Sequence, residues 1–347
     1  MLFMRKIQRE NIKKILLIRR DNIGDLICTT PAIHALRESY PDAMLGVLVN
    51  SYNAHAVINN PDIDKIHIYE KFKHVYSKGR YNVWSSNARV LFDIRNECYD
   101  VAIGCSNKYS SRLARYAFLT GARYRIGYLP AGKKSVYYNL PLIEASEPVH
   151  EVISVFRLLA SFGIEVEPSK LVLMPSKITQ EKVITLLQSS NFSTDKLVAV
   201  HISSRKPNNK WPKEKFAELI NKLVNNDNAA VMLLWAPGSK DNPYHPGDDE
   251  DAEWIRKAVN AKIFSYHTER LDELIAALSI ARLVICCDGG AMHIAAALGK
   301  PILTIWGSTD KRRWAPWKVD NIILQKGKTA DEITAEEVMA AFEKLWR

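Results

Sequence analysis

The sequence lacks a long apolar run. Apolar stretches such as Ile15 to Ile18 have the length of a strand, whereas a membrane-spanning helix needs about 18 to 20 apolar residues in succession. The N-terminal segment MLFMRKIQRENIKK is basic, but it has neither the apolar centre nor the small-residue cleavage site of a secretory signal. We therefore expect a cytoplasmic protein.

Cysteine is also scarce. The five cysteines are odd in number and contain no C-x-x-C pair, so the sequence predicts neither a disulfide framework nor a zinc site. Cys286 and Cys287 stand together at the end of an apolar run, and we interpret them as small buried thiols.

The length and composition that remain are those of a globular protein. The chain has 347 residues, of which 47% are hydrophobic and 25% charged, and this balance excludes a disordered or fibrous chain. At a typical size of about 150 residues per domain, two domains are expected.

Positive charge is concentrated in the first half of the chain. Residues 1–150 contain 22 Lys and Arg against 13 Asp and Glu, a net +9, whereas residues 151–347 contain 26 against 25, a net +1. A basic half indicates an anionic partner. Nucleic acid, an acidic membrane surface and a phosphorylated substrate all remain open at this point.

Strand-like and helix-like segments alternate along both halves. The predicted strands span 14–19, 44–49, 65–69, 101–104, 197–201, 230–235, 283–287 and 302–306, and the predicted helices span 31–39, 88–96, 142–162, 213–225, 271–279 and 291–298. Such alternation is typical of parallel, doubly wound sheets, so two Rossmann-like domains are expected.

A linker separates the two predicted domains. The segment GIEVEPS at 163–169 contains a Gly stop and a Pro, so we assign residues 1–165 to an N-terminal domain and 166–330 to a C-terminal domain. Residues 331–347 form an amphipathic helix with Val338, Phe342 and Leu345 on one face. That face is expected to pack on a core, and one candidate surface is the N-terminal domain.

The first segment whose residues could take part in binding or catalysis is RRDNIGD, which directly follows the first predicted strand. Ligands of open parallel sheets bind at the carboxyl ends of the strands. The segment has no G-x-G-x-x-G pattern, but Gly24 permits a tight turn and Asp25 places a carboxylate at a helix start. Asp25 is either a helix cap or a catalytic base, and the residues alone favour the cap.

Two later segments could hold an anion. Ser203, Ser204, Arg205, Lys206 and Lys210 lie in the loop between a strand and a helix, which is either an anion site or a solvated basic loop. Asp288, Gly289, Gly290 and His293 stand where a strand turns into a helix. Glycine amides at such a turn approach a diphosphate without obstruction, which favours phosphate binding. The acidic cluster at 248–253 is interpreted as an exposed loop and helix start.

In this order, the segments resemble the bacterial ADP-heptose:lipopolysaccharide heptosyltransferase family, glycosyltransferase family 9. The matching stretches are KILLIRRDNIGDLICTTPAIHALRESYP, NNKWPKEKFAELI and LVICCDGGAMHIAAALGKPILTIWGSTD. The resemblance implies a GT-B fold, α/β, with two Rossmann-like doubly wound domains facing a central cleft. It places the acceptor in the N-terminal domain and the nucleotide-sugar donor in the C-terminal one.

The resemblance also implies roles for residues. Asp25 corresponds to the proposed general base of an inverting transfer, and Arg20, Asn22 and Gly24 belong to its acceptor-side loop. The implied donor site comprises Ser203, Ser204, Arg205, Lys206, Lys210, Asp288, Gly289, Gly290 and His293. The reaction implied is transfer of heptose from ADP-heptose to the anionic lipopolysaccharide core, with no metal and no cofactor. Peripheral attachment to the cytoplasmic face of the inner membrane is compatible with it.

Departures from the family pattern lie on the donor side. Asn209 stands where the family often has Lys, with Lys210 one residue nearer to the Trp-Pro pair, and Gly289 stands where Thr is usual. No acidic ribose contact is identified after Trp235. A different nucleotide sugar or surface-glycan acceptor therefore stays open. A non-enzymatic basic module for nucleic acid or anionic membrane is disfavoured, because no nucleic-acid motif is present.

Overall fold

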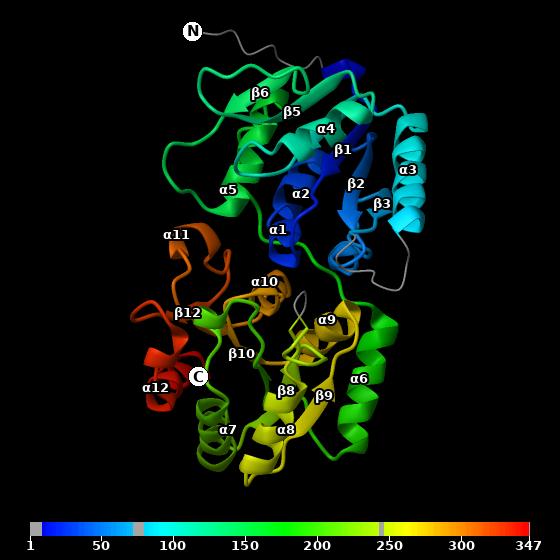
Figure 1. The fold of residues 1–347 in the computed structure, drawn as a ribbon. Helices are drawn as coiled ribbons and strands as arrows, with labels where there is room; N and C mark the ends of the chain where they lie inside the picture. The colour runs from blue at the N-terminus through cyan, green and yellow to red at the C-terminus, as the bar shows by residue number, and fades with distance from the viewer. Residues whose placement is uncertain (1–8, 72–79, 243–245, 347) are drawn as a thin grey trace. The chain divides into compact units, whose positions relative to one another are not determined.

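The computed structural model describes residues 9–71, 80–242 and 246–346. Residues 1–8 of the segment considered as a secretory signal lie outside the described residues. The chain forms two compact units, Met1–Val172 and Leu173–Arg347 (Figure 1). Within the described ranges, no helix combines the length and the apolar character that crossing a membrane requires.

The N-terminal unit is a parallel six-stranded sheet with helices on its faces (Figure 1). The strand order is β3-β2-β1-β4-β5-β6. The strands are β1 Lys14–Ile18, β2 Met44–Asn50, β3 Lys65–Tyr69, β4 Val101–Gly104, β5 Tyr124–Leu129 and β6 Leu140–Ile143. The helices are α1 Ile23–Ile27, α2 Thr30–Ser39, α3 Arg80–Asn96, α4 Ser111–Leu119 and α5 Glu151–Phe156, followed by the 3-10 helix η4 Arg157–Phe162.

The C-terminal unit repeats this architecture. Its sheet is also parallel and has the order β12-β11-β10-β7-β8-β9. The strands are β7 Leu197–His201, β8 Ala230–Trp235, β9 Phe264–His267, β10 Leu283–Cys287, β11 Ile302–Ile305 and β12 Asn321–Leu324. The helices are α6 Lys177–Ser189, α7 Lys213–Asp227, α8 Asp249–Ala258, α9 Leu271–Ile280, α10 Gly290–Ala297, α11 Lys311–Trp314 and α12 Ala335–Trp346.

The central strands are apolar because helices cover both faces of each sheet. All of β7 and β10 is buried, and in β1 only Lys14 is partly exposed. The predicted α/β class with two Rossmann-like units is confirmed. In each sheet the strand order reverses at the centre, between β1 and β4 and between β7 and β10. Ligands of such sheets bind beyond the carboxyl ends of the strands at this switch point.

Three expectations need correction. The long helix predicted over 142–162 is wrong, because Leu140–Ile143 pairs with β5 as strand β6 and the helical part begins only at Glu151, after Pro148. The unit boundary falls after Val172 rather than after residue 165, because the amide of Val172 donates to the hydroxyl of Thr30 at 2.9 Å and keeps the linker on the N-terminal unit.

The third correction concerns the C-terminal helix. It does form, as α12, but it packs on α7, β11 and β12 of its own unit. Val338 and Phe342 are fully buried in the core cluster of that unit. The amphipathic stripe is therefore core packing within the C-terminal unit, and the N-terminal domain was the wrong candidate surface.

Cys286 and Cys287 are buried as predicted. Burial raises the pKa of the Cys286 thiol well above its usual value and the pKa of Cys287 to about 12, because a thiolate is poorly solvated in an apolar core. Both groups are therefore inert thiols at neutral pH.

Two buried histidines make the fold sensitive to acid. Burial lowers the pKa of His67, which contacts the hydroxyl of Tyr99, and that of His201 to about 4 each. In the unfolded chain a histidine binds its proton near pH 6.5. We predict that the unfolding free energy falls between pH 6.5 and pH 4, by up to about 1.4 kcal/mol per pH unit for each histidine. Urea denaturation at a series of pH values across this range should show that the unfolding free energy depends less steeply on pH in His201→Gln than in the parent chain. An equal slope would show that His201 is protonated in the folded state.

Candidate active site

The predicted site residues of both units lie where central strands end. In the N-terminal unit, the predicted residues 20–25 follow β1, and residues 105–112, which were not predicted, follow its neighbour β4. In the C-terminal unit, residues 202–210 follow β7 and residues 288–293 follow its neighbour β10. Each group therefore stands at the switch point of its own sheet.

Arg19 is the structural centre of the N-terminal group. One guanidinium nitrogen, Nη2, lies 2.7 Å from both Asp25 Oδ1 and Glu151 Oε1, and Nη1 donates to the carbonyl of Cys105 at 3.0 Å. Arg19 is 2% exposed and Glu151 is fully buried. Burial by itself would lower the pKa of Arg19, but the carboxylates of Asp25, Glu151 and Asp21 raise it above its usual value. The guanidinium is therefore permanently charged.

Asp25 is held on both of its oxygens. Oδ1 accepts from Arg19, and Oδ2 accepts from the backbone amide of Asn22 at 3.1 Å and from the Asn22 side chain at 3.2 Å. Gly24 is buried inside α1, where its carbonyl accepts from the amide of Cys28. Asp25 thus does cap α1. Its side chain is still 13% exposed, so a fixed carboxylate also reaches the surface of the sheet edge.

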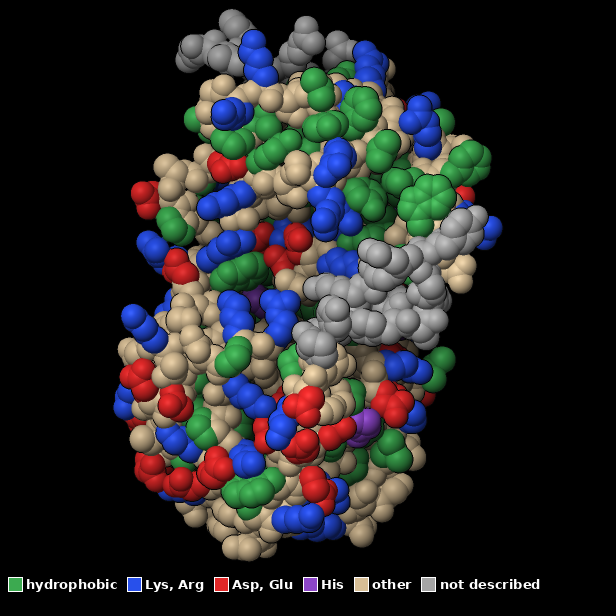
Figure 2. Space-filling model, viewed as in Figure 1, with side chains coloured by type: hydrophobic (Ala, Val, Ile, Leu, Met, Phe, Trp, Pro, Cys, Tyr) green, Lys and Arg blue, Asp and Glu red, His purple; other side chains and the backbone are tan. Residues whose placement is uncertain are grey.

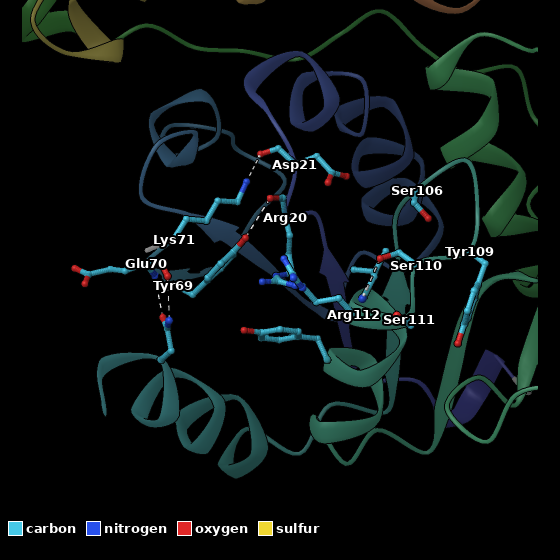
Figure 3. Close-up of a pocket in the computed structure, with 13 residues that line it drawn as sticks. Arg20, Asp21, Tyr69, Glu70, Lys71, Ser106, Tyr109, Ser110, Ser111 and Arg112 are labelled. Carbon is cyan, nitrogen blue, oxygen red and sulfur yellow. Dashed lines mark hydrogen bonds between the residues drawn. The ribbon is translucent and has the colours of Figure 1, made fainter. Parts of the chain in front are cut away.

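Arg20, the neighbour of Arg19 in the chain, points into a pocket of the N-terminal unit (Figure 3). Its guanidinium carbon lies 3.9 Å from the ring centre of Tyr116 and 4.6 Å from that of Tyr69. The Tyr69 hydroxyl donates to the backbone carbonyl of Arg20 at 3.1 Å. Two aromatic rings therefore restrain one cation, so little freedom remains for it to lose when a ligand binds.

The pocket has a volume of about 840 Å³ and a polar lining. Its charged and hydroxyl-bearing residues are Arg20, Asp21, Tyr69, Glu70, Lys71, Ser106, Tyr109, Ser110, Ser111, Arg112 and Tyr116. Ser110 caps α4 by accepting from the amide of Leu113. Burial raises the pKa of Asp21, against the opposing effect of Arg19. Three cations and several hydroxyls in one pocket suit an anionic, hydroxylated ligand.

Sequence reasoning found Arg20 but missed most of this pocket. Tyr69 ends β3 and Lys71 follows it, whereas Ser106 to Ser110 come from the loop after β4 and Ser111 and Arg112 begin α4. Part of the pocket could have been found from the sequence. β4 was predicted, and the loop after it had to lie at the same edge of the sheet as the loop after β1. The partners Arg19 and Glu151 are 132 residues apart in the chain, and no spacing pattern indicates their contact.

In the C-terminal unit, hydroxyls tie neighbouring loops together. Ser203 Oγ accepts from the amide of Ala236 at 2.8 Å, and Ser204 Oγ donates to the carbonyl of Asp288 at 3.2 Å. The next residues, Arg205 and Lys206, are exposed. The structure therefore brings the predicted serines to the edge where β7, β8 and β10 end, with two cations beside them.

Asn209 connects neighbouring loops in this region. The side chain is 1% exposed. Its Nδ2 donates to Asp288 Oδ2 at 2.7 Å and to Thr309 Oγ1 at 2.9 Å, and its Oδ1 accepts from the amide of Gly307. Thr309 also donates to Asp288 Oδ2, at 2.6 Å. The residue noted as a departure from the family pattern is thus a structural link between three loops, and Asp288 is an internal acceptor that fixes the glycine turn.

The glycine turn after β10 has room in front of it. A Cβ on Gly289 would meet no atom within 4 Å, and the extended backbone at this residue does not require glycine. Gly290 begins α10, and His293 on that helix is buried. The ring centre of His293 lies 5.8 Å from that of Trp314, over which Arg313 stacks at 4.6 Å. Arg313 is a cation of this sheet edge that sequence reasoning missed.

Lys210, which the resemblance assigns to the donor site, is paired with acids of its own unit. Its ammonium contacts Asp248 and lies 2.7 Å from Asp251 of α8. Burial would lower the pKa of Lys210, but these two carboxylates raise it. Two carboxylates already neutralise this cation, and its ammonium has one further N–H to donate. Asp248, predicted to be exposed, is buried as half of this pair.

Acidic, histidine and cysteine side chains do not gather into a metal-binding group of three or more in the described part of the chain. The acids that do approach the two edges are engaged with cations or amides, as Asp25 is with Arg19 and Asp248 with Lys210.

Comparisons with known proteins identify the family that the chain is similar to. A family model described as glycosyltransferase family 9 (heptosyltransferase) matches residues 88–341. Lipopolysaccharide heptosyltransferase 3 of Escherichia coli strain K12 is 26% identical, over 93% of this chain and 95% of that protein.

Solved structures show the same fold. A glycosyl transferase of family 9 from Veillonella parvula DSM 2008 is 20% identical, with a TM-score of 0.83 over 98% of both chains. The Escherichia coli heptosyltransferase WaaC, solved with ADP-2-deoxy-2-fluoro heptose, is 18% identical, with a TM-score of 0.72 over 95% of this chain and 99% of that one. The GT-B class expected from the sequence is thereby confirmed.

Proposed function

We propose that this chain, which belongs to glycosyltransferase family 9 and is therefore a sugar-transferring enzyme, moves heptose from ADP-heptose to the inner core of lipopolysaccharide. The observation that carries the proposal is the carboxylate of Asp25, which Arg19 fixes after β1, in the unit whose pocket contains Arg20, Lys71 and Arg112. The names of the relatives support the donor and the acceptor, since they include a lipopolysaccharide heptosyltransferase and a structure with an ADP-heptose analogue.

Asp25 is proposed to act as the general base. It takes the proton of the acceptor hydroxyl while that oxygen bonds to the anomeric carbon, and ADP leaves from the opposite face with the bonding electron pair. Such a displacement inverts the anomeric centre. Arg19 and Glu151 act as positioning residues. Arg19 holds the Asp25 carboxylate in one orientation, and Glu151 holds Arg19.

The C-terminal unit is proposed to hold the donor. The open backbone at Gly289 and the start of α10 face a diphosphate with amide groups and the positive end of a helix dipole. Arg205, Lys206 and Arg313 supply cations for the charge that develops on ADP. Lys210 is left out of this set because of its ion pairs with Asp248 and Asp251.

We propose further that these amides and cations stabilise the leaving diphosphate without a metal ion. Arg205, Lys206 and Arg313 support this proposal, since fixed cations can neutralise the charge that a metal ion would otherwise neutralise. Cytoplasmic location, with the lipid-linked acceptor reached at the inner membrane, belongs to the same proposal.

A second candidate keeps the reaction and changes the donor. Asn209 and Gly289, the two departures noted in the sequence, both lie at the proposed donor site. Another nucleotide sugar therefore stays the alternative to ADP-heptose, and the panel below separates the two.

A thermal-shift panel with ADP, UDP, GDP and CMP tests the donor. A ligand that binds only the folded state stabilises it and so raises its melting temperature. At a ligand concentration 100 times Kd, the free energy of unfolding increases by about 2.7 kcal/mol. We expect ADP to give the largest shift, and EDTA to leave that shift unchanged. A larger shift with UDP or GDP would overturn the sugar donor, and loss of the ADP shift with EDTA would overturn metal-independent binding.

The Asp25→Asn variant tests the base. We expect turnover to fall by about 10² to 10⁴, while the ADP-induced shift in melting temperature stays as in the parent protein. Asp42→Asn, in an exposed turn of the same unit, is the matched control and should retain full turnover. Normal turnover in Asp25→Asn would exclude Asp25 as the base.

The Arg112→Gln variant tests the pocket as the acceptor site. Loss of one charge-assisted contact to an anionic sugar should raise the acceptor KM about tenfold, since such a contact contributes about 1.5 kcal/mol or more. The donor KM should not change. Arg157→Gln, an exposed arginine of η4, is the control. An increase confined to the donor KM would place the acceptor elsewhere.

A further inference from the structure

Most of the net charge of the chain lies in one segment. Residues 80–140 contain ten Lys and Arg against three Asp and Glu, so they carry +7 of the total +10. Two of the three acids are engaged with the start of β1 and with β3. Glu97 pairs with Lys14 and Lys65, and Asp100 accepts from the amides of Lys13 and Lys14. The positive charge of α3, α4 and β5 is therefore largely uncompensated.

The same segment exposes large apolar side chains. Trp84 is 69% exposed, Phe92 64%, Phe118 48%, Leu119 46% and Val136 78%. Burial within the unit does not explain them, because α3 already buries Val83 and Ile94 on its opposite side. Where exposed apolar side chains form one contiguous patch with polar residues around it, the patch is typical of an interaction surface.

Contacts between elements join these side chains into one surface. Trp84, Ala88, Phe92 and Arg95 recur at the spacing of one helical face of α3. Arg95 reaches the carbonyl of Leu119 at the end of α4.

From α4 the surface continues to the connection between β5 and β6. The ring centre of Phe118 lies 5.8 Å from that of Tyr137, and Arg125 stacks over Phe118 at 5.5 Å. Figure 2 shows hydrophobic and basic side chains intermixed over this part of the N-terminal unit. We call it the aromatic-basic surface. It comprises the exposed apolar side chains named above and the exposed cations Arg89, Arg95, Arg115, Arg123, Lys133 and Lys134.

We propose that the aromatic-basic surface binds an anionic lipid bilayer. Aromatic rings settle at the level of lipid headgroups, where one edge is apolar and the other is wet. Lys and Arg near an anionic leaflet contribute attraction that adds to the apolar insertion. The proposal rests on the proposed function in one respect, since an enzyme whose acceptor is anchored in the membrane must reach that acceptor at the bilayer surface.

Vesicle co-sedimentation of the full chain tests the proposal. We expect binding to vesicles of phosphatidylethanolamine and phosphatidylglycerol, weaker binding at high salt, and little binding to phosphatidylcholine alone. Replacing Arg115 or Arg123 by Gln should each weaken the binding about fivefold. Trp84→Ser with Phe92→Ser should weaken it further, whereas Ile178→Ser, at an exposed position of α6, should have no effect.

A site-specific readout comes from tryptophan fluorescence. Brominated lipids quench a tryptophan only when it enters the bilayer. Quenching should be lost in Trp84→Phe and retained in Trp254→Phe, which alters an exposed tryptophan of α8. Both substitutions keep an aromatic ring, so neither should disturb the fold.

The outcomes are distinguishable from those of the proposed function. Equal binding to anionic and neutral vesicles, no binding at all, or quenching that persists in Trp84→Phe would each overturn the bilayer proposal. Light scattering that shows a dimer dissociated by the Trp84→Ser and Phe92→Ser substitutions would assign the surface to a second copy of the chain instead. Salt-sensitive binding to oligonucleotides alone would assign it to nucleic acid. Turnover of a water-soluble acceptor reports the enzyme independently of all three.

Discussion

The buried charge of Arg19 is the constraint on which the N-terminal site depends. A guanidinium that is 2% exposed would be strongly destabilising without partners, and removing one member of such a buried pair typically costs about 3 to 5 kcal/mol. Its partners come from α1, from the loop after β4 and from the start of α5. The charge therefore fixes three segments relative to one another, and one of them carries Asp25 in a single orientation.

The C-terminal unit solves a similar problem with neutral groups. Asn209 has two amide donors and one acceptor, and it uses all of them on the loops after β10 and β11. A lysine at this position could not accept from the amide of Gly307, so the loop geometry would have to change with it. Asn209 therefore helps to fix the glycine turn through Asp288. The cations of this region, Arg205, Lys206 and Arg313, lie in other segments, after β7 and in α11.

Much of the fold was predictable because parallel strands are buried on both faces and are apolar throughout. β3, β7, β8 and β10 were predicted with their exact ends. The region around β6 failed because LPLI contains a proline, which is unusual in a strand, and lies at the edge of its sheet, where pairing with β5 decides the conformation. The end of the first unit was predicted seven residues too early. A hydrogen bond between Val172 and Thr30, which are remote in sequence, decides where the linker packs.

The sequence by itself determined the two α/β units, the strand ends at which polar residues gather, and the concentration of positive charge in the first half. These follow from local patterns of apolar residues, glycines and charge. Tertiary structure decided which of the gathered groups are available. Only folding brings Glu151 to Arg19, pairs Lys210 with Asp248 and Asp251, and places Tyr69 and Tyr116 around Arg20. Electrostatic and stacking energies depend on distance in space, and distance along the chain does not report it.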